Sequence, residues 1–144
     1  MPNLDLTKAQ RLAMYALSEE MPGITFTPTL SDDGKELKIS GNVRMKGHDD
    51  GILAILECEA GFATMTMVFD KIGKTEYTLN LVNRLNCEQV FFRCFIRDDG
   101  YLVLDSCFDV YGEQDFAISA ALFFNKAKMV GEHSTLKELT RLTQ

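Results

Sequence analysis

Apolar residues recur at helical spacing in the first part of the chain, from Leu6 to Glu20. Thr7 and Gln10 have the spacing of a capping box, and the pair Pro22-Gly23 marks the end of the segment. The pattern therefore predicts a helix that is capped by Thr7 and runs to about Glu20. Four residues would form the stripe that packs on the rest of the protein, Leu12, Ala13, Ala16 and Leu17.

From Ile24 onward the apolar period changes to two, which is the period of a strand. Two hairpins are predicted here, the first with its turn at Asp32-Asp33-Gly34 and the second with its turn at Ala60-Gly61. The polar segment from Gly47 to Gly51 is expected to be the loop that connects the two hairpins. Pairing Glu59 with Phe62 places one set of apolar residues on a common inner face: Ile52, Ala54, Leu56, Cys58, Ala63, Met65, Met67 and Phe69.

A third hairpin is predicted over residues 89–110 around the turn Asp98-Asp99-Gly100. Pairing Arg97 with Tyr101 places Phe95 opposite Val103, Arg93 opposite Asp105 and Phe91 opposite Cys107. The other face would then be almost wholly apolar, with Val90, Phe92, Cys94, Ile96, Leu102, Leu104, Phe108 and Val110.

Helical patterns also cover residues 76–86, with Thr78, Leu81, Val82 and Leu85 on one side, and residues 113–130, while 135–142 is a weaker helical segment. The expected fold class is α+β in the order α-β-β-β-β-α-β-β-α, with a mostly antiparallel sheet of hairpins. A length of 144 residues fits one domain over 1–144, in which we expect 1–4 and 132–144 to be flexible or peripheral.

The charge of the chain argues against nucleic acid and anionic membranes as partners. The formal net charge is -6, and the 15 Lys and Arg residues form no run that could follow a line of phosphates. The first residues show neither the basic nor the apolar part of a signal peptide, and no apolar stretch reaches the ~20 residues that span a bilayer. We therefore expect a cytoplasmic protein whose four cysteines are free thiols.

The sequence contains no recognisable catalytic or metal-binding pattern. His48 and His133 are the only histidines, and neither has a second ligand three or four residues away. The paired aspartates at 32–33, 49–50 and 98–99 all lie near glycine, where aspartate is typical of turns. We expect no metal, no cofactor and no enzymatic activity.

Apolar residues cover more of the surface of the predicted helix over 113–130 than the single stripe of an ordinary amphipathic helix. Five of its residues, Phe116, Ala120, Phe123, Phe124 and Ala127, are candidates for a homodimer interface, because an exposed apolar surface of this size is typical of association. The alternative is that the N-terminal helix of the same chain buries them.

The outer face of the third hairpin is the candidate surface for a protein partner. It combines aromatic residues with an arginine, a composition that is typical of interfaces, in Phe91, Arg93, Phe95, Tyr101, Val103 and Asp105. Either edge strand could also accept an extended peptide. A helix of the same chain covering this face is the alternative interpretation. A different hypothesis is a small-ligand sensor with an apolar pocket lined by Met65, Met67 and Phe92.

Two segments resemble the YbjN family of bacterial proteins, which are described loosely as sensory transduction regulators. They are Leu81-Val82-Asn83-Arg84-Leu85-Asn86 and the hairpin from Arg97 to Leu104, and the resemblance extends over about residues 4 to 131. Asn83 and Asn86 match the family pattern and would end the helix. The order of elements is also similar to that of type III secretion chaperones. These resemblances imply a dimeric, non-enzymatic, chaperone-like or regulatory protein that holds a partner polypeptide.

Overall fold

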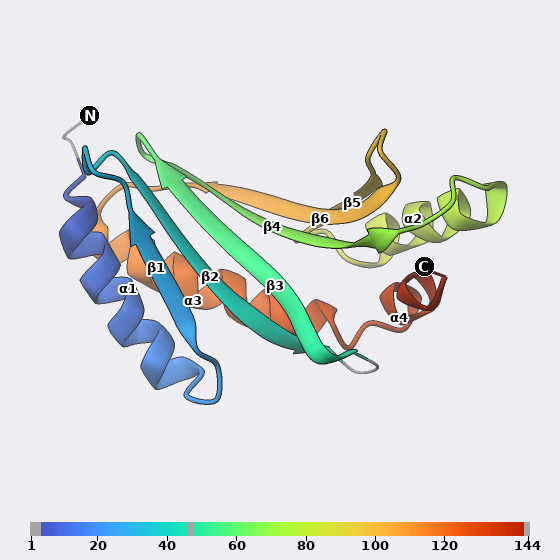
Figure 1. Cartoon of the computed structure of the whole chain (residues 1–144), viewed down its shortest axis with the longest axis horizontal. Coiled ribbons are helices and arrows are strands. Elements are labelled where there is room, and N and C mark those ends of the chain that lie inside the picture. Colours follow the sequence, from blue (N-terminus) through green and yellow to red (C-terminus); the bar gives the residue numbers. More distant parts are fainter. Residues whose placement is uncertain (1–3, 46–47, 143–144) are drawn as a thin grey trace.

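The computed structural model describes residues 4–45 and 48–142. These residues form six antiparallel strands and four helices (Figure 1). In chain order they are α1 (Leu6–Glu20), β1 (Phe26–Leu30), β2 (Glu36–Met45), β3 (His48–Glu59), β4 (Phe62–Lys71), α2 (Glu76–Glu88), β5 (Arg93–Ile96), β6 (Tyr101–Asp109), α3 (Glu113–Val130) and α4 (Ser134–Arg141). The α+β class and the predicted order are confirmed, with α4 as an additional C-terminal helix.

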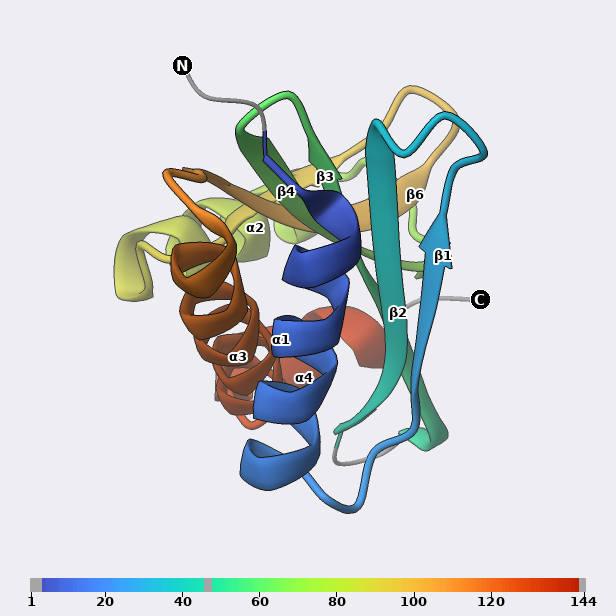
Figure 2. The ribbon, with the colours of Figure 1, turned by 90° about the vertical axis from the view of Figure 1, so that its left-hand side faces the viewer.

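The six strands form one curved sheet in the order β1-β2-β3-β4-β6-β5. Helices α1 and α3 lie side by side on the concave face against β1 to β3, and α2 packs on α4 and β5. Figure 2 shows the sheet curving around the helices, while its convex face carries none of them. The sheet therefore has one face that faces the core and one outer face.

The predicted registers and faces of the central strands are confirmed. Glu59 pairs with Phe62, and the inner residues of β3 and β4 from Ala54 to Phe69 are buried. Helix α2 buries Thr78, Leu81, Val82 and Leu85, and Thr75 caps it through a box closed by the Thr78 side chain. The alternation in the strands and the stripe on the helix were sufficient to place these residues.

Two predictions about the N-terminal half of the chain are wrong, the capping residue of α1 and the loop before β3. Asp5 and not Thr7 caps α1, since the Asp5 carboxylate accepts a hydrogen bond from the backbone N–H of Lys8 at 3.1 Å. The predicted loop from Gly47 to Gly51 is strand from His48 onward, with His48 paired to Met45; Gly47 lies outside the described residues. Gly51 has φ 74°, so the glycine serves a twisted strand instead of a loop.

The five side chains that we expected at a dimer interface lie in the core of the single chain, so this expectation is corrected. They are Phe116, Ala120, Phe123, Phe124 and Ala127, and none is more than 6% exposed. The physical reason is that α3 packs against the sheet on one side and against α1 on another, so two of its sides are covered. The alternative of burial by the N-terminal helix describes their environment.

The segment after α3 is less peripheral than expected. Leu136 and Leu139 of α4 are buried, and the Thr135 hydroxyl donates a 2.6 Å hydrogen bond to the Glu88 carboxylate of α2. Leu4 packs partly against the core. Residues 1–3 and 143–144 lie outside the described part of the chain.

Substitution of Phe124 should destabilise the protein strongly. Its ring is fully buried, with its centroid 4.8 Å from that of Phe26 in an edge-to-face contact. Phe124→Ala should lower the free energy of unfolding by about 3–5 kcal/mol, because it leaves a cavity. The neighbouring Leu122 is 45% exposed, and Leu122→Ala should change it by less than about 1 kcal/mol. Urea denaturation followed by circular dichroism measures both values; equal effects would contradict the packing of α3.

Candidate functional site

The outer face of the sheet carries a row of apolar side chains across four strands. Val68 of β4 pairs with Val103 of β6, which pairs with Phe95 of β5, and the register of β3 with β4 places Leu53 next to Val68. Leu53 and Val68 are 48% and 40% exposed. This outer-face row therefore presents apolar surface where a sheet with one solvated face normally carries polar residues.

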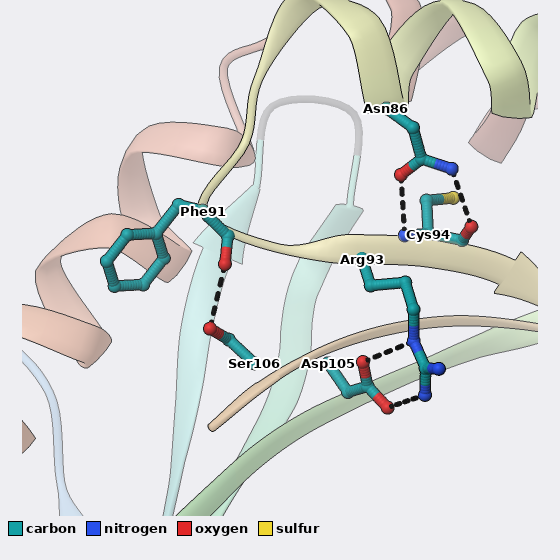
Figure 3. A network of polar contacts seen from close by, with 6 residues as sticks. All are labelled: Asn86, Phe91, Arg93, Cys94, Asp105 and Ser106. Carbon is teal, nitrogen blue, oxygen red and sulfur yellow. Dashed lines mark hydrogen bonds and ion pairs between the residues drawn. The ribbon is translucent and has the colours of Figure 1, made fainter. Parts of the chain in front are cut away.

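Arg93 and Asp105 form the predicted pair beside this row (Figure 3). The Arg93 Nε and Nη2 atoms donate hydrogen bonds of 3.1 and 2.8 Å to the two carboxylate oxygens of Asp105, and the guanidinium lies 4.7 Å from the centre of the Phe95 ring. The hydrogen bond with Asp105 raises the pKa of Arg93. Because the arginine side chain is 71% exposed, this pair contributes little to stability and remains available for contact.

A second cationic group lies at the tip of the same hairpin. Arg97 pairs bidentately with Asp99, and the resulting hydrogen bonds lower the pKa of Asp99. Arg97 and Lys71 both lie over the Tyr101 ring, 5.2 and 5.4 Å from its centre. Five of the six predicted partner-binding residues thus lie together on the outer face, although Val103 is only 2% exposed.

Phe91 does not lie on this face, and its predicted pairing with Cys107 is wrong. Strand β5 begins only at Arg93, and the Phe91 ring packs on Phe123 of α3 with the ring centres 4.6 Å apart. The Ser106 hydroxyl donates to the Phe91 carbonyl at 2.7 Å and fixes the chain at this point (Figure 3). Val90, predicted to face the core, is 94% exposed as a result.

Two amide side chains cover the free edge of β5. Asn86 of α2 accepts from the backbone N–H of Cys94 at 2.8 Å and donates to its carbonyl at 2.9 Å (Figure 3). Gln89 bonds both backbone groups of Phe92 in the same way, at 2.8 and 2.5 Å. Each amide thus takes the place of a neighbouring strand, and the edge cannot accept a peptide at these positions. Asn83 is exposed.

An open groove of about 740 Å³ lies where the chain before β5 leaves β6. Its lining combines the exposed Val90 and Phe62 with Phe91, Arg93, Asp105 and Cys107. Polar residues of α2, β4, β6 and the start of the loop after α2 complete it: Asn86, Thr64, Ser106 and Gln89. The sequence prediction missed Phe62, Leu53 and Val68. Their parity in the strands, opposite to that of the inner face, was the signal that could have identified them.

The four cysteines fall into two chemical groups. Cys58 and Cys94 are buried, and desolvation raises the pKa of their thiols to about 11 and about 12. Cys87 and Cys107 are exposed, and Cys107 lines the groove. At neutral pH only the exposed pair is suited to react with a thiol reagent.

Within the described residues no three His, Cys, Asp or Glu side chains lie close enough to hold a metal ion together. His133 caps α4, with its Nδ1 accepting from the Thr135 N–H at 3.2 Å; the His48 side chain lies outside the described part. Met65 and Met67 are fully buried, and neither lines the groove. The outer face and the groove are therefore the arrangement best suited to a function.

No protein-family model matches the chain, and no curated protein matches it either. Among the described residues, no helix combines the length and the apolar content needed to cross a bilayer.

Removal of the Asn86 amide should destabilise the edge of β5. Asn86→Ala leaves the Cys94 N–H and carbonyl without their partner, which should lower the free energy of unfolding by about 1–3 kcal/mol. Asn83→Ala, on an exposed position of the same helix, is the matched control and should stay within about 0.5 kcal/mol. Chemical denaturation measures both. An equal loss in the two variants would mean that the amide does not hold the edge.

Proposed function

We propose that the protein is a non-catalytic protein-binding module that holds a partner polypeptide on the outer face of its sheet. The observation that carries this proposal is the outer-face row, in which Leu53 and Val68 are both at least 40% exposed. The neighbouring Arg93, Phe95 and Tyr101 add the arginine and aromatic groups that are enriched at interfaces. The resemblance to YbjN-like proteins and to secretion chaperones supports the same function and a cytoplasmic location.

We further propose that the protein self-associates through α3. Its exposed apolar residues are Ile118, Leu122 and Met129, which are 62%, 45% and 56% exposed. Their separations of four and seven residues place them along one side of the helix. This stripe lies on the opposite layer of the molecule from the outer-face row, so a dimer would leave the row free for a partner.

The partner proposal predicts a specific loss of binding. Leu53→Ser combined with Val68→Ser should reduce recovery of a co-purified partner by about tenfold, because it removes the centre of the apolar surface. Tyr15→Ser combined with Leu79→Ser replaces residues of similar exposure on helices and should leave recovery unchanged. Affinity purification of tagged variants from native cells, with quantitative mass spectrometry, makes the comparison. A partner retained by the first variant would place the binding surface elsewhere.

The self-association proposal predicts a change in molar mass. Ile118→Asp combined with Leu122→Asp should convert a dimer to a folded monomer, because it introduces charge into the exposed stripe on α3. Leu79→Asp combined with Asn80→Asp adds the same charge to α2 and should remain dimeric. Light scattering after size-exclusion chromatography gives the masses. A monomeric unmodified protein, or a dimer that survives the α3 substitutions, would exclude this interface.

A further inference from the structure

The two outermost strands of the sheet are protected against pairing with another chain. At one side β1 is short and contains Pro28, which lacks a backbone N–H. At the other side Asn86 and Gln89 occupy the outward-facing backbone groups of Cys94 and Phe92. An incoming strand therefore has no open row of partners at either position.

The last residues of β6 have a free edge, because β5 does not extend alongside them. The bond from the Arg97 N–H to the Tyr101 carbonyl sets the alternation of the ladder, and by this alternation Tyr101, Val103 and Asp105 face β5. Cys107 and Asp109 have the same parity, but the last pair of the ladder is Arg93 with Asp105. In the described part of the chain, no residue on that side hydrogen-bonds to the backbone of Cys107 or Asp109.

The groove lies along this open stretch of β6. Its volume of about 740 Å³ falls in the usual range of binding sites, roughly 300–1,000 Å³. The Cys107 side chain and the 48% exposed Phe62 line it on the sheet side, and Val90 lines it on the side of the departing loop. The groove thus combines backbone groups open to pairing with apolar contacts beside them, which is the combination used in β-strand addition.

The charges around the groove favour a cationic occupant. Glu59 and Asp109 both pair with Phe62, and Glu36 pairs with Glu59, so three exposed carboxylates gather at this end of the outer face. Like charges directly opposite each other destabilise a sheet. The neighbouring cations are Lys38, Arg93 and Lys126. Lys38 lies opposite Glu57, Arg93 is bound to Asp105, and Lys126 lies 5.7 Å from the centre of the Phe91 ring. A second copy of the chain, with net charge -6, is a poor match for this surface.

We propose that the groove beside Cys107 binds an extended polypeptide segment in which apolar and basic residues lie two positions apart, which adds a short strand to the free edge of β6. Residues two positions apart in an extended strand share one face, so an apolar residue contacts Phe62 and Val90 while a basic residue lies beside Asp109, on the same face as Glu59. This inference rests on the proposed protein-binding function and names the chemistry of the partner segment.

Binding of synthetic peptides to the intact protein tests the proposal. The probe is a fluorescein-labelled ten-residue peptide in which valine and lysine take turns at every second position with threonine between them, compared with the same peptide carrying glutamate in place of lysine and with the valine–lysine peptide N-methylated at every second residue. Fluorescence anisotropy should show at least about tenfold tighter binding of the unmodified valine–lysine peptide than of either control. The same peptide should slow maleimide labelling of Cys107 several-fold and leave Cys87, which does not line the groove, unaffected.

Charge reversal provides the matched variants. Glu59→Lys combined with Asp109→Lys should weaken binding of the valine–lysine peptide by about tenfold. Glu19→Lys combined with Glu20→Lys makes the same change in net charge on α1 and should leave the affinity unchanged. Equal affinity for all three peptides, or binding without protection of Cys107, would overturn the proposal. Such a result leaves the proposed function intact, because that function is tested at Leu53 and Val68, outside the groove.

Discussion

The packing of Phe91 against α3 determines where β5 begins and so the shape of the groove beside β6. The Phe91 ring contacts the rings of Phe92 and Phe123, with centres 5.1 and 4.6 Å apart, and Phe123 in turn contacts Phe108 at 4.3 Å. To deliver this ring to the core, the chain must leave the sheet before Arg93. The ring is partly buried against the core, and this burial is comparable with the loss of one pair of ladder hydrogen bonds: full burial of such a ring contributes about 1.5–3 kcal/mol, and each hydrogen bond about 1 kcal/mol.

The amide side chains of Asn86 and Gln89 are a second consequence of the same departure. A strand of four residues at the edge of a sheet needs partners for its outward backbone groups, and α2 ends at the place where its last turn can supply them. The asparagine that resembles a helix terminator in the sequence is thus a substitute for a strand. The protein protects the edge of β5 and leaves open the stretch of β6 that β5 does not cover.

Much of the fold follows from the sequence because the turns fix the registers. Asp98-Asp99-Gly100 was sufficient to pair Arg93 with Asp105, and the alternation around Ala60-Gly61 placed the inner face of β3 and β4. The start of β5 could not be predicted, because Phe91 continues the alternating pattern and only its contact with α3 removes it from the sheet. The burial of α3 was misjudged for a similar reason. An apolar helix that packs against both a sheet and a neighbouring helix of its own chain has the same pattern as one at a subunit interface, and only the tertiary arrangement distinguishes them.

The position of the exposed apolar residues distinguishes the two proposed contacts. Once Phe123 and Phe124 are assigned to the core, the remaining apolar surface divides between α3, where Ile118 is 62% exposed, and the outer sheet face, where Leu53 is 48% exposed. The helices lie on the concave face of the sheet, so these two surfaces point away from each other. The two proposed contacts are therefore compatible on one molecule. Because the open end of β6 borders the outer face, an extended segment bound there would continue directly onto the apolar row.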